Sequence, residues 1–169
     1  MGTAECFLAT EYKRETVLSK LFLSPTGEKL KEYRARNELP DFAGGYIKQK
    51  LFLLLCWNWS FVDDELNYGM SFDKKGVLIG AVEDHVGYSY IGQWKDREKI
   101  WSVTLYEPAP LAVEGGSPTK VKKYVETMLA KGESPFNIPV DLFEHFTGYR
   151  YLNWDSVILS DEFEVFQLE

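Results

Sequence analysis

The sequence predicts an α+β fold in which helices pack on one face of an antiparallel sheet. Two observations support this class. Apolar residues follow helical spacing in the first third of the chain and again after the middle third. The middle third instead alternates apolar and polar residues with a period of two, which is typical of half-buried strands. With 169 residues the chain has the length of one domain, so we expect a single globular α+β domain over residues 1–169.

Three helices are expected in the first third of the chain. Thr10–Leu23 carries its apolar residues on one helical stripe, and a second helix is expected to follow Ser24-Pro25 and end at Arg36. Leu39–Gly45 is expected to be a connector, because proline and paired glycines interrupt regular structure. The apolar segment Tyr46–Trp57 predicts a third helix that is buried on most of its circumference.

A central antiparallel β-meander of about four to five strands follows. Short turns separate its segments, which favours antiparallel neighbours. The predicted strands are Leu66–Phe72, Val77–Val82, Tyr88–Trp94 and Ile100–Tyr106, with a further one over 59–62. Two more helices are expected over Pro118–Lys131 and Pro139–Phe146, and the tail Val157–Leu168 is expected to return to the sheet as one or two strands.

Composition argues against several classes of protein. Hydrophobic residues make up 45% of the chain and aromatic residues 15%, so a disordered chain is excluded. The net charge of −7 lacks the basic excess that nucleic-acid binding needs. The longest apolar run, Leu51–Trp57, is too short to cross a bilayer, and the N-terminus lacks the features of a signal peptide. From these two features we expect no membrane partner. Cys6 and Cys56 match no disulfide framework or zinc motif, so we expect a cytoplasmic protein without a cofactor.

One cluster of polar residues suggests an enzyme. Glu83 and His85 lie at the end of a predicted strand, where they would share a face, and Asp63-Asp64 precedes the neighbouring strand. Asp63, Asp64, Glu83, Asp84 and His85 could bind a divalent metal or supply a general base with an orienting carboxylate, as in a small metal-dependent hydrolase. The alternative is that these residues are ordinary polar turns.

A second alternative is nucleic-acid binding through the N-terminal basic helix. Basic and aromatic residues mix there and could contact phosphates: Lys29, Lys31, Tyr33, Arg34 and Arg36, with Lys48 and Lys50 nearby in sequence. We expect them instead to form a solvated helix face whose partners are Glu28, Glu32 and Glu38.

The poverty of catalytic motifs favours a non-catalytic protein-binding module, such as an inhibitor, an immunity protein or an antagonist of another macromolecule. Residues 151–169 carry five acids and no base, so the expected partner is a protein with a basic surface. The acidic contacts would be Asp161, Glu162 and Glu164 on a strand whose Phe163 and Val165 face inward. Four aromatic residues of the late sheet could anchor the partner: Tyr88, Tyr90, Trp94 and Trp101. The identity of the partner and the oligomeric state stay open.

Overall fold

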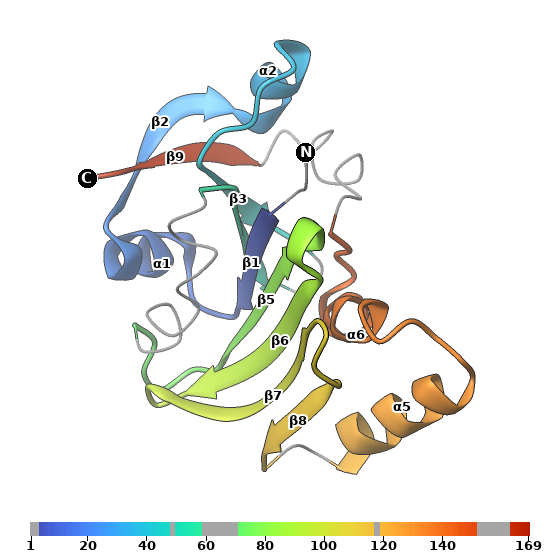
Figure 1. The fold of residues 1–169 in the computed structure, drawn as a ribbon. Helices are drawn as coiled ribbons and strands as arrows, with labels where there is room; N and C mark the ends of the chain where they lie inside the picture. The colour runs from blue at the N-terminus through green and yellow to red at the C-terminus, as the bar shows by residue number, and fades with distance from the viewer. Residues whose placement is uncertain (1–3, 48–49, 59–70, 117–118, 152–162) are drawn as a thin grey trace.

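The computed structural model describes residues 4–47, 50–58, 71–116, 119–151 and 163–169 (Figure 1). Its strands are β1 (Ala4–Thr10), β2 (Leu23–Lys29), β3 (Phe42–Tyr46), β4 (Phe52–Cys56), β5 (Val77–Glu83), β6 (Tyr88–Lys95), β7 (Glu98–Tyr106), β8 (Ala112–Gly115) and β9 (Glu164–Leu168). Its helices are α1 (Arg14–Leu21), α2 (Leu30–Ala35), α5 (Thr119–Ala130) and α6 (Asn137–Thr147), with a 3-10 turn η2 (Asp84–Val86).

The described strands form one nine-stranded sheet in the order β2-β9-β3-β4-β1-β5-β6-β7-β8, and every neighbouring pair is antiparallel. The prediction of a four- to five-stranded meander is therefore wrong. The meander exists as β5 to β8, where consecutive hairpins join strand to strand. It is only one half of the sheet, and strands from both ends of the chain build the other half. The broader α+β class holds.

Helices cover both faces of the sheet, which corrects the expected one-sided arrangement. Figure 1 shows α1 on one side of the central strands and α5 and α6 on the other. Each face has its own hydrophobic core. We call them the α1 core, which contains Val17, Leu18 and Leu21, and the α6 core, which contains Val125, Ile138, Leu142 and Phe143. The two cores arise because successive side chains of a strand point to opposite faces.

The helix predicted over Tyr46–Trp57 is a hairpin of β3 and β4. In β4, Leu53 and Leu55 enter the α6 core, whereas Phe52, Leu54 and Cys56 enter the α1 core. A strand buried on both faces is apolar at every position, so its sequence loses the period of two and resembles a buried helix. The paired glycines of the expected connector belong to β3, where a Cβ on Gly44 would lie 2.8 Å from the Leu53 carbonyl oxygen.

β1 and β2 were not predicted. All seven residues of β1 are buried, including Cys6, because β1 lies between β4 and β5 and is covered on both faces. The second predicted helix begins only at Leu30, because Leu23–Lys29 pairs with β9 as β2. The predicted strands at Val77, Tyr88 and Ile100 and the helices α5 and α6 agree with the structure to within a few residues. The strand predicted over Leu66–Phe72 and the one over 59–62 fall largely or wholly outside the described residues.

Candidate functional site

The turn between β5 and β6 gathers three of the predicted site residues. β5 ends at Glu83, η2 contains Asp84 and His85, and Gly87 closes the turn with a φ of 66°, a conformation that glycine adopts without strain. His85 Nε2 lies 3.2 Å from Glu83 Oε1, so these two residues do meet. They meet through the 3-10 turn and not, as the sequence suggested, on one face of a strand.

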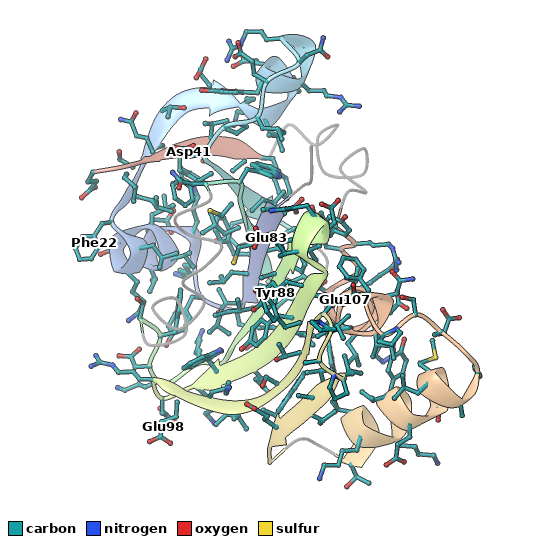
Figure 2. All side chains as sticks on the ribbon, viewed as in Figure 1. Phe22, Asp41, Glu83, Tyr88, Glu98 and Glu107 are labelled. Atoms are coloured by element: carbon teal, nitrogen blue, oxygen red, sulfur yellow. The ribbon has the colours of Figure 1, made fainter. Side chains whose placement is uncertain are left out.

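The end of β7 brings further acidic and aromatic side chains to this turn. The backbone N–H of Glu107 donates to the Gly87 carbonyl at 3.2 Å, and a Cβ on Gly87 would lie 2.7 Å from Glu107 Oε2. The Glu107 side chain therefore lies against the turn. Tyr88 pairs with Tyr106 across β6 and β7, with ring centroids 6.1 Å apart, and Tyr106 is 59% exposed. Figure 2 labels Glu83, Tyr88 and Glu107 in this region.

We define the acidic end as Glu83, Asp84, Tyr88, Tyr106 and Glu107. It carries three carboxylates and two tyrosine rings on adjoining strands. The Arg150 guanidinium, on the segment that leads to Tyr151, is ion-paired with Asp141 and Glu144 of α6. Burial lowers the pKa of Arg150, but these two carboxylates outweigh it and raise the pKa, so Arg150 stays charged and occupied by α6. The acidic end thus presents carboxylates beside apolar ring surface.

A buried carboxylate that the sequence analysis missed lies near the acidic end. Glu5 of β1 is fully buried, and its carboxylate accepts hydrogen bonds from the Tyr149 hydroxyl at 2.5 Å and from Trp57 Nε1 at 3.3 Å. Buried polar side chains need such hydrogen-bond partners. A signal was present in the sequence, because Glu5 alternates in register with the apolar Phe7 and Ala9 and had to face the same side.

Tyr151 links this region to the acidic end. Its hydroxyl donates to Asp84 Oδ2 at 3.5 Å. Burial, followed by the nearby negative charge of Asp84, raises the pKa of Tyr151 to about 12. The Tyr151 hydroxyl therefore stays protonated and acts as a hydrogen-bond donor over the physiological pH range.

The other predicted aromatic contacts lie inside the molecule. Tyr90 and Trp94 are 3% and 4% exposed in the α1 core, where Trp94 Nε1 donates to the Tyr90 hydroxyl at 3.2 Å. Trp101 is 2% exposed in the α6 core. The Tyr90 ring lies over Gly92, which leaves room for it because a Cβ on Gly92 would be 2.6 Å from Tyr90 Cζ. Of the four predicted aromatic contacts, Tyr88 alone lies at the acidic end.

The acidic C-terminal segment is described only in part, since Asp161 and Glu162 lie outside the described residues. Phe163 and Val165 are buried, as expected. Glu164 does not project alone toward solvent, because its carboxylate is paired with Arg14 and lies 3.4 Å from Lys29 Nζ. Glu164 therefore joins β9 to α1 and β2 through ion pairs within the protein.

The basic residues near α2 are held by neighbouring acids. Arg36 lies 3.4 Å from Glu28 and 3.1 Å from Glu38, and its guanidinium stacks on Tyr33 at 4.4 Å. The pairing of Arg36 with Glu28 and Glu38 agrees with the expected partners. The surface is not a single helix face, because Glu28 and Lys29 belong to β2 and Lys29 pairs with Glu164. Lys48 lies outside the described residues.

For the metal-dependent enzyme, the deciding residues Asp63 and Asp64 lie outside the described segments. Within those segments no group of three or more His, Cys, Asp or Glu side chains is arranged to bind a metal ion. The contact between His85 and Glu83 is the geometry of a general base with an orienting carboxylate, and it stands on the exposed side of a turn. That alternative stays a prediction.

Comparison of the chain with protein-family models, with curated proteins and with solved structures returns no match. In the part of the chain that the structure describes, none of the helices combines the length and the apolar character needed to cross a bilayer. Function is therefore inferred from the geometry of the described residues.

Proposed function

We propose that the protein is a non-catalytic protein-binding module, of the inhibitor, immunity-protein or antagonist kind, and that its acidic end binds a basic surface of the partner. The observation that carries this proposal is the exposed Tyr106 ring, which packs on Tyr88 and is followed in the chain by Glu107, whose side chain lies against the turn after β5. Tyrosine is enriched at the energetic centres of protein interfaces, because it buries a large apolar ring and keeps a polar tip.

The proposed binding surface is the acidic end and not the C-terminal strand. Glu164 is occupied by Arg14 and Lys29, so it has little charge to offer a partner. Glu107 makes no ion pair within the described residues and lies against Gly87 of the turn that contains Asp84. Carboxylates at the rim of an interface act mainly on the association rate, and the effect is screened by salt.

Affinity capture from the source cells tests the proposal. Purified protein and the variants Tyr106→Ala and Glu107→Lys are used as bait, and captured proteins are quantified by mass spectrometry. The matched controls are Phe22→Ala and Glu98→Lys, which change an exposed aromatic residue and an exposed acid far from the acidic end (Figure 2). A genuine partner is captured by the wild type and both controls and is lost with Tyr106→Ala.

Binding kinetics with the captured partner complete the test. Tyr106→Ala is expected to weaken binding about tenfold or more, mainly through faster dissociation. Glu107→Lys is expected to slow association at low salt, and the difference from wild type should shrink at about 0.5 M salt because charges are then screened within a few ångströms. A partner that binds both variants as tightly as the controls would contradict the proposed surface.

A further inference from the structure

A cleft of about 620 Å³ opens at the opposite end of β5 from the acidic end. The end of β1, the start of β5, the end of β6 and the C-terminal turn of α6 enclose it. This volume lies within the range of about 300–1,000 Å³ that is usual for small-molecule sites. The residues that give the cleft its chemistry are Lys74, Lys75, Lys95, Gln93, Trp101 and Phe146.

The polar wall of the cleft offers hydrogen-bond donors. Trp101 Nε1, which can only donate, donates a hydrogen bond to Gln93 Oε1 at 2.7 Å. That bond fixes the orientation of the Gln93 amide and leaves its NH₂ group facing the cleft wall at Gly76, where a Cβ would be 3.6 Å from Nε2. The Thr10 hydroxyl is already used, since it donates to the Gly76 carbonyl and accepts from the Tyr12 N–H.

The rim of the cleft is positively charged although the protein is acidic. Among the described residues that line it are three exposed lysines and one acid, Glu11. Lys75 is held in place, because its Nζ donates to the Glu11 carbonyl oxygen at 3.4 Å and lies 5.7 Å from the centre of the Tyr12 ring. Within the described residues neither Lys74 nor Lys95 makes an ion pair.

The apolar part of the cleft is aromatic. Trp101 is buried in the α6 core and contributes to the lining, whereas Phe146, in the last turn of α6, is 47% exposed. Their ring centroids are 6.1 Å apart at an angle of 44°. An exposed phenylalanine beside a buried indole provides a surface on which a flat ring can stack.

We propose that this cleft binds a small organic anion with a planar ring. The ring stacks on Phe146, an acceptor atom takes a hydrogen bond from the Gln93 NH₂ group, and the anionic group lies between Lys74 and Lys95. Mononucleotides and aromatic carboxylates both have this chemistry. The site is separate from the acidic end, so this inference does not rest on the proposed protein-binding function.

Calorimetric titration of the full chain tests the inference with two matched series. The first pairs the four ribonucleoside monophosphates with their uncharged nucleosides, and the second pairs benzoate and indole-3-acetate with their neutral amides. Inorganic phosphate alone serves as the anion without a ring. We expect one series to bind with a Kd below 1 mM, with at least tenfold weaker binding of the uncharged counterparts and of phosphate. Which series binds identifies the source of the anion.

Three variants locate the binding. Phe146→Ala should weaken it about tenfold by removing the stacking surface. Gln93→Glu keeps an oxygen for Trp101 Nε1 but replaces the donor with a carboxylate, so it should abolish anion binding while the protein stays folded. Lys74→Ala with Lys95→Ala should weaken binding about three- to tenfold and reduce its dependence on salt.

Controls remove matching groups elsewhere. Leu129→Ala removes an exposed apolar side chain, and Lys122→Ala with Lys131→Ala removes two exposed lysines, none of which lines the cleft. Circular dichroism and the melting temperature verify that each variant is folded. The inference is overturned if neither series binds below 1 mM, if the neutral counterparts bind equally well, or if folded Gln93→Glu and Phe146→Ala bind like the controls.

Discussion

Gly80 is the position where the structure makes its sharpest prediction about stability. It lies in β5 directly opposite Phe7 of β1, and the Phe7 ring lies flat over it. A Cβ added at Gly80 would be 2.0 Å from Phe7 Cε2 and 2.6 Å from Phe7 Cδ2. Phe7 is 1% exposed and packs edge-on against Phe143 at 4.5 Å and against Tyr149 at 5.8 Å.

The expected loss follows from this geometry. To restore an ordinary carbon–carbon contact of about 3.5 Å, the Phe7 ring would have to retreat by about 1.5 Å. Phe143 blocks that movement on the α6 side, and Tyr149 is held by its hydrogen bond to Glu5. Overpacking a core typically costs about 1–3 kcal/mol, and we expect Gly80→Ala to lower the free energy of unfolding by about 3 kcal/mol.

Urea denaturation followed by tryptophan fluorescence measures this loss, and a thermal scan should show a melting temperature lowered by about 6–12 °C. Gly116→Ala is the matched control, because a Cβ at Gly116 meets no atom within 4 Å and its φ is not positive. The control should stay within about 0.5 kcal/mol of wild type. If Gly80→Ala is as stable as the control, the Phe7 ring does not lie over Gly80 and the packing of β1 on β5 is not as described.

Two further predictions concern charge. Glu164→Gln should lower the free energy of unfolding by about 1 kcal/mol, because the half-buried pairing with Arg14 and Lys29 is lost. The control Gln167→Lys changes an exposed residue of β9 and should cost less than about 0.5 kcal/mol in the same urea assay. Because burial raises the pKa of Tyr151 to about 12, the folded protein holds this proton more tightly than the unfolded chain, so the stabilisation is complete below pH 10 and is lost as the pH rises toward 12. A rise in pKa of this size corresponds to at most about 2.7 kcal/mol, and solvent screening of this partly exposed ring reduces it to about 1 kcal/mol. The variant Tyr151→Phe should therefore lose less stability than wild type between pH 9 and pH 11.5. Equal losses in the two proteins would contradict the raised pKa.

The part of the fold that the sequence predicts well is the part determined by local contacts. β5, β6 and β7 are joined by tight turns, and β6 and β7 keep polar residues among their apolar ones, whereas β5 is apolar up to Glu83 and is marked by the turns on either side of it. The turn between β6 and β7 holds Asp96 and Arg97 at positive φ, and the sequence marks it by a run of charged residues. Such signals need no knowledge of the rest of the chain.

The part that could not be predicted depends on which segments cover each other. β4 is apolar at every position because β1 and β3 flank it and a core lies on each face. Only the completed sheet distinguishes this strand from a buried helix. β2 contains Pro25 and Gly27, which argue against a strand, and it is tolerated because it is an edge strand paired on one side with β9.

The candidate site shows the same division. The approach of Glu83 to His85 could be anticipated, since they are two residues apart. The approach of Tyr106 and Glu107 depends on the register of β6 against β7, which a bulge at Gln93 and Trp94 sets. A shift of one residue would turn Tyr106 to the other face of the sheet. The same bulge region supplies Gln93 to the cleft, so neither surface could be assembled from local patterns.

The acidic end and the cleft are separated by the length of β5. From Val77, which lines the cleft, to Glu83, the strand spans about 20 Å at roughly 3.3 Å per residue. This exceeds the screening length of about 8 Å at physiological salt, so charge at one end has little effect at the other. A lysine change at the cleft should therefore leave the association rate of a protein partner unchanged, and Glu107→Lys should leave anion binding unchanged. The net charge of −7 describes neither surface, because it averages an acidic end with a cleft whose described lining carries three lysines and one glutamate.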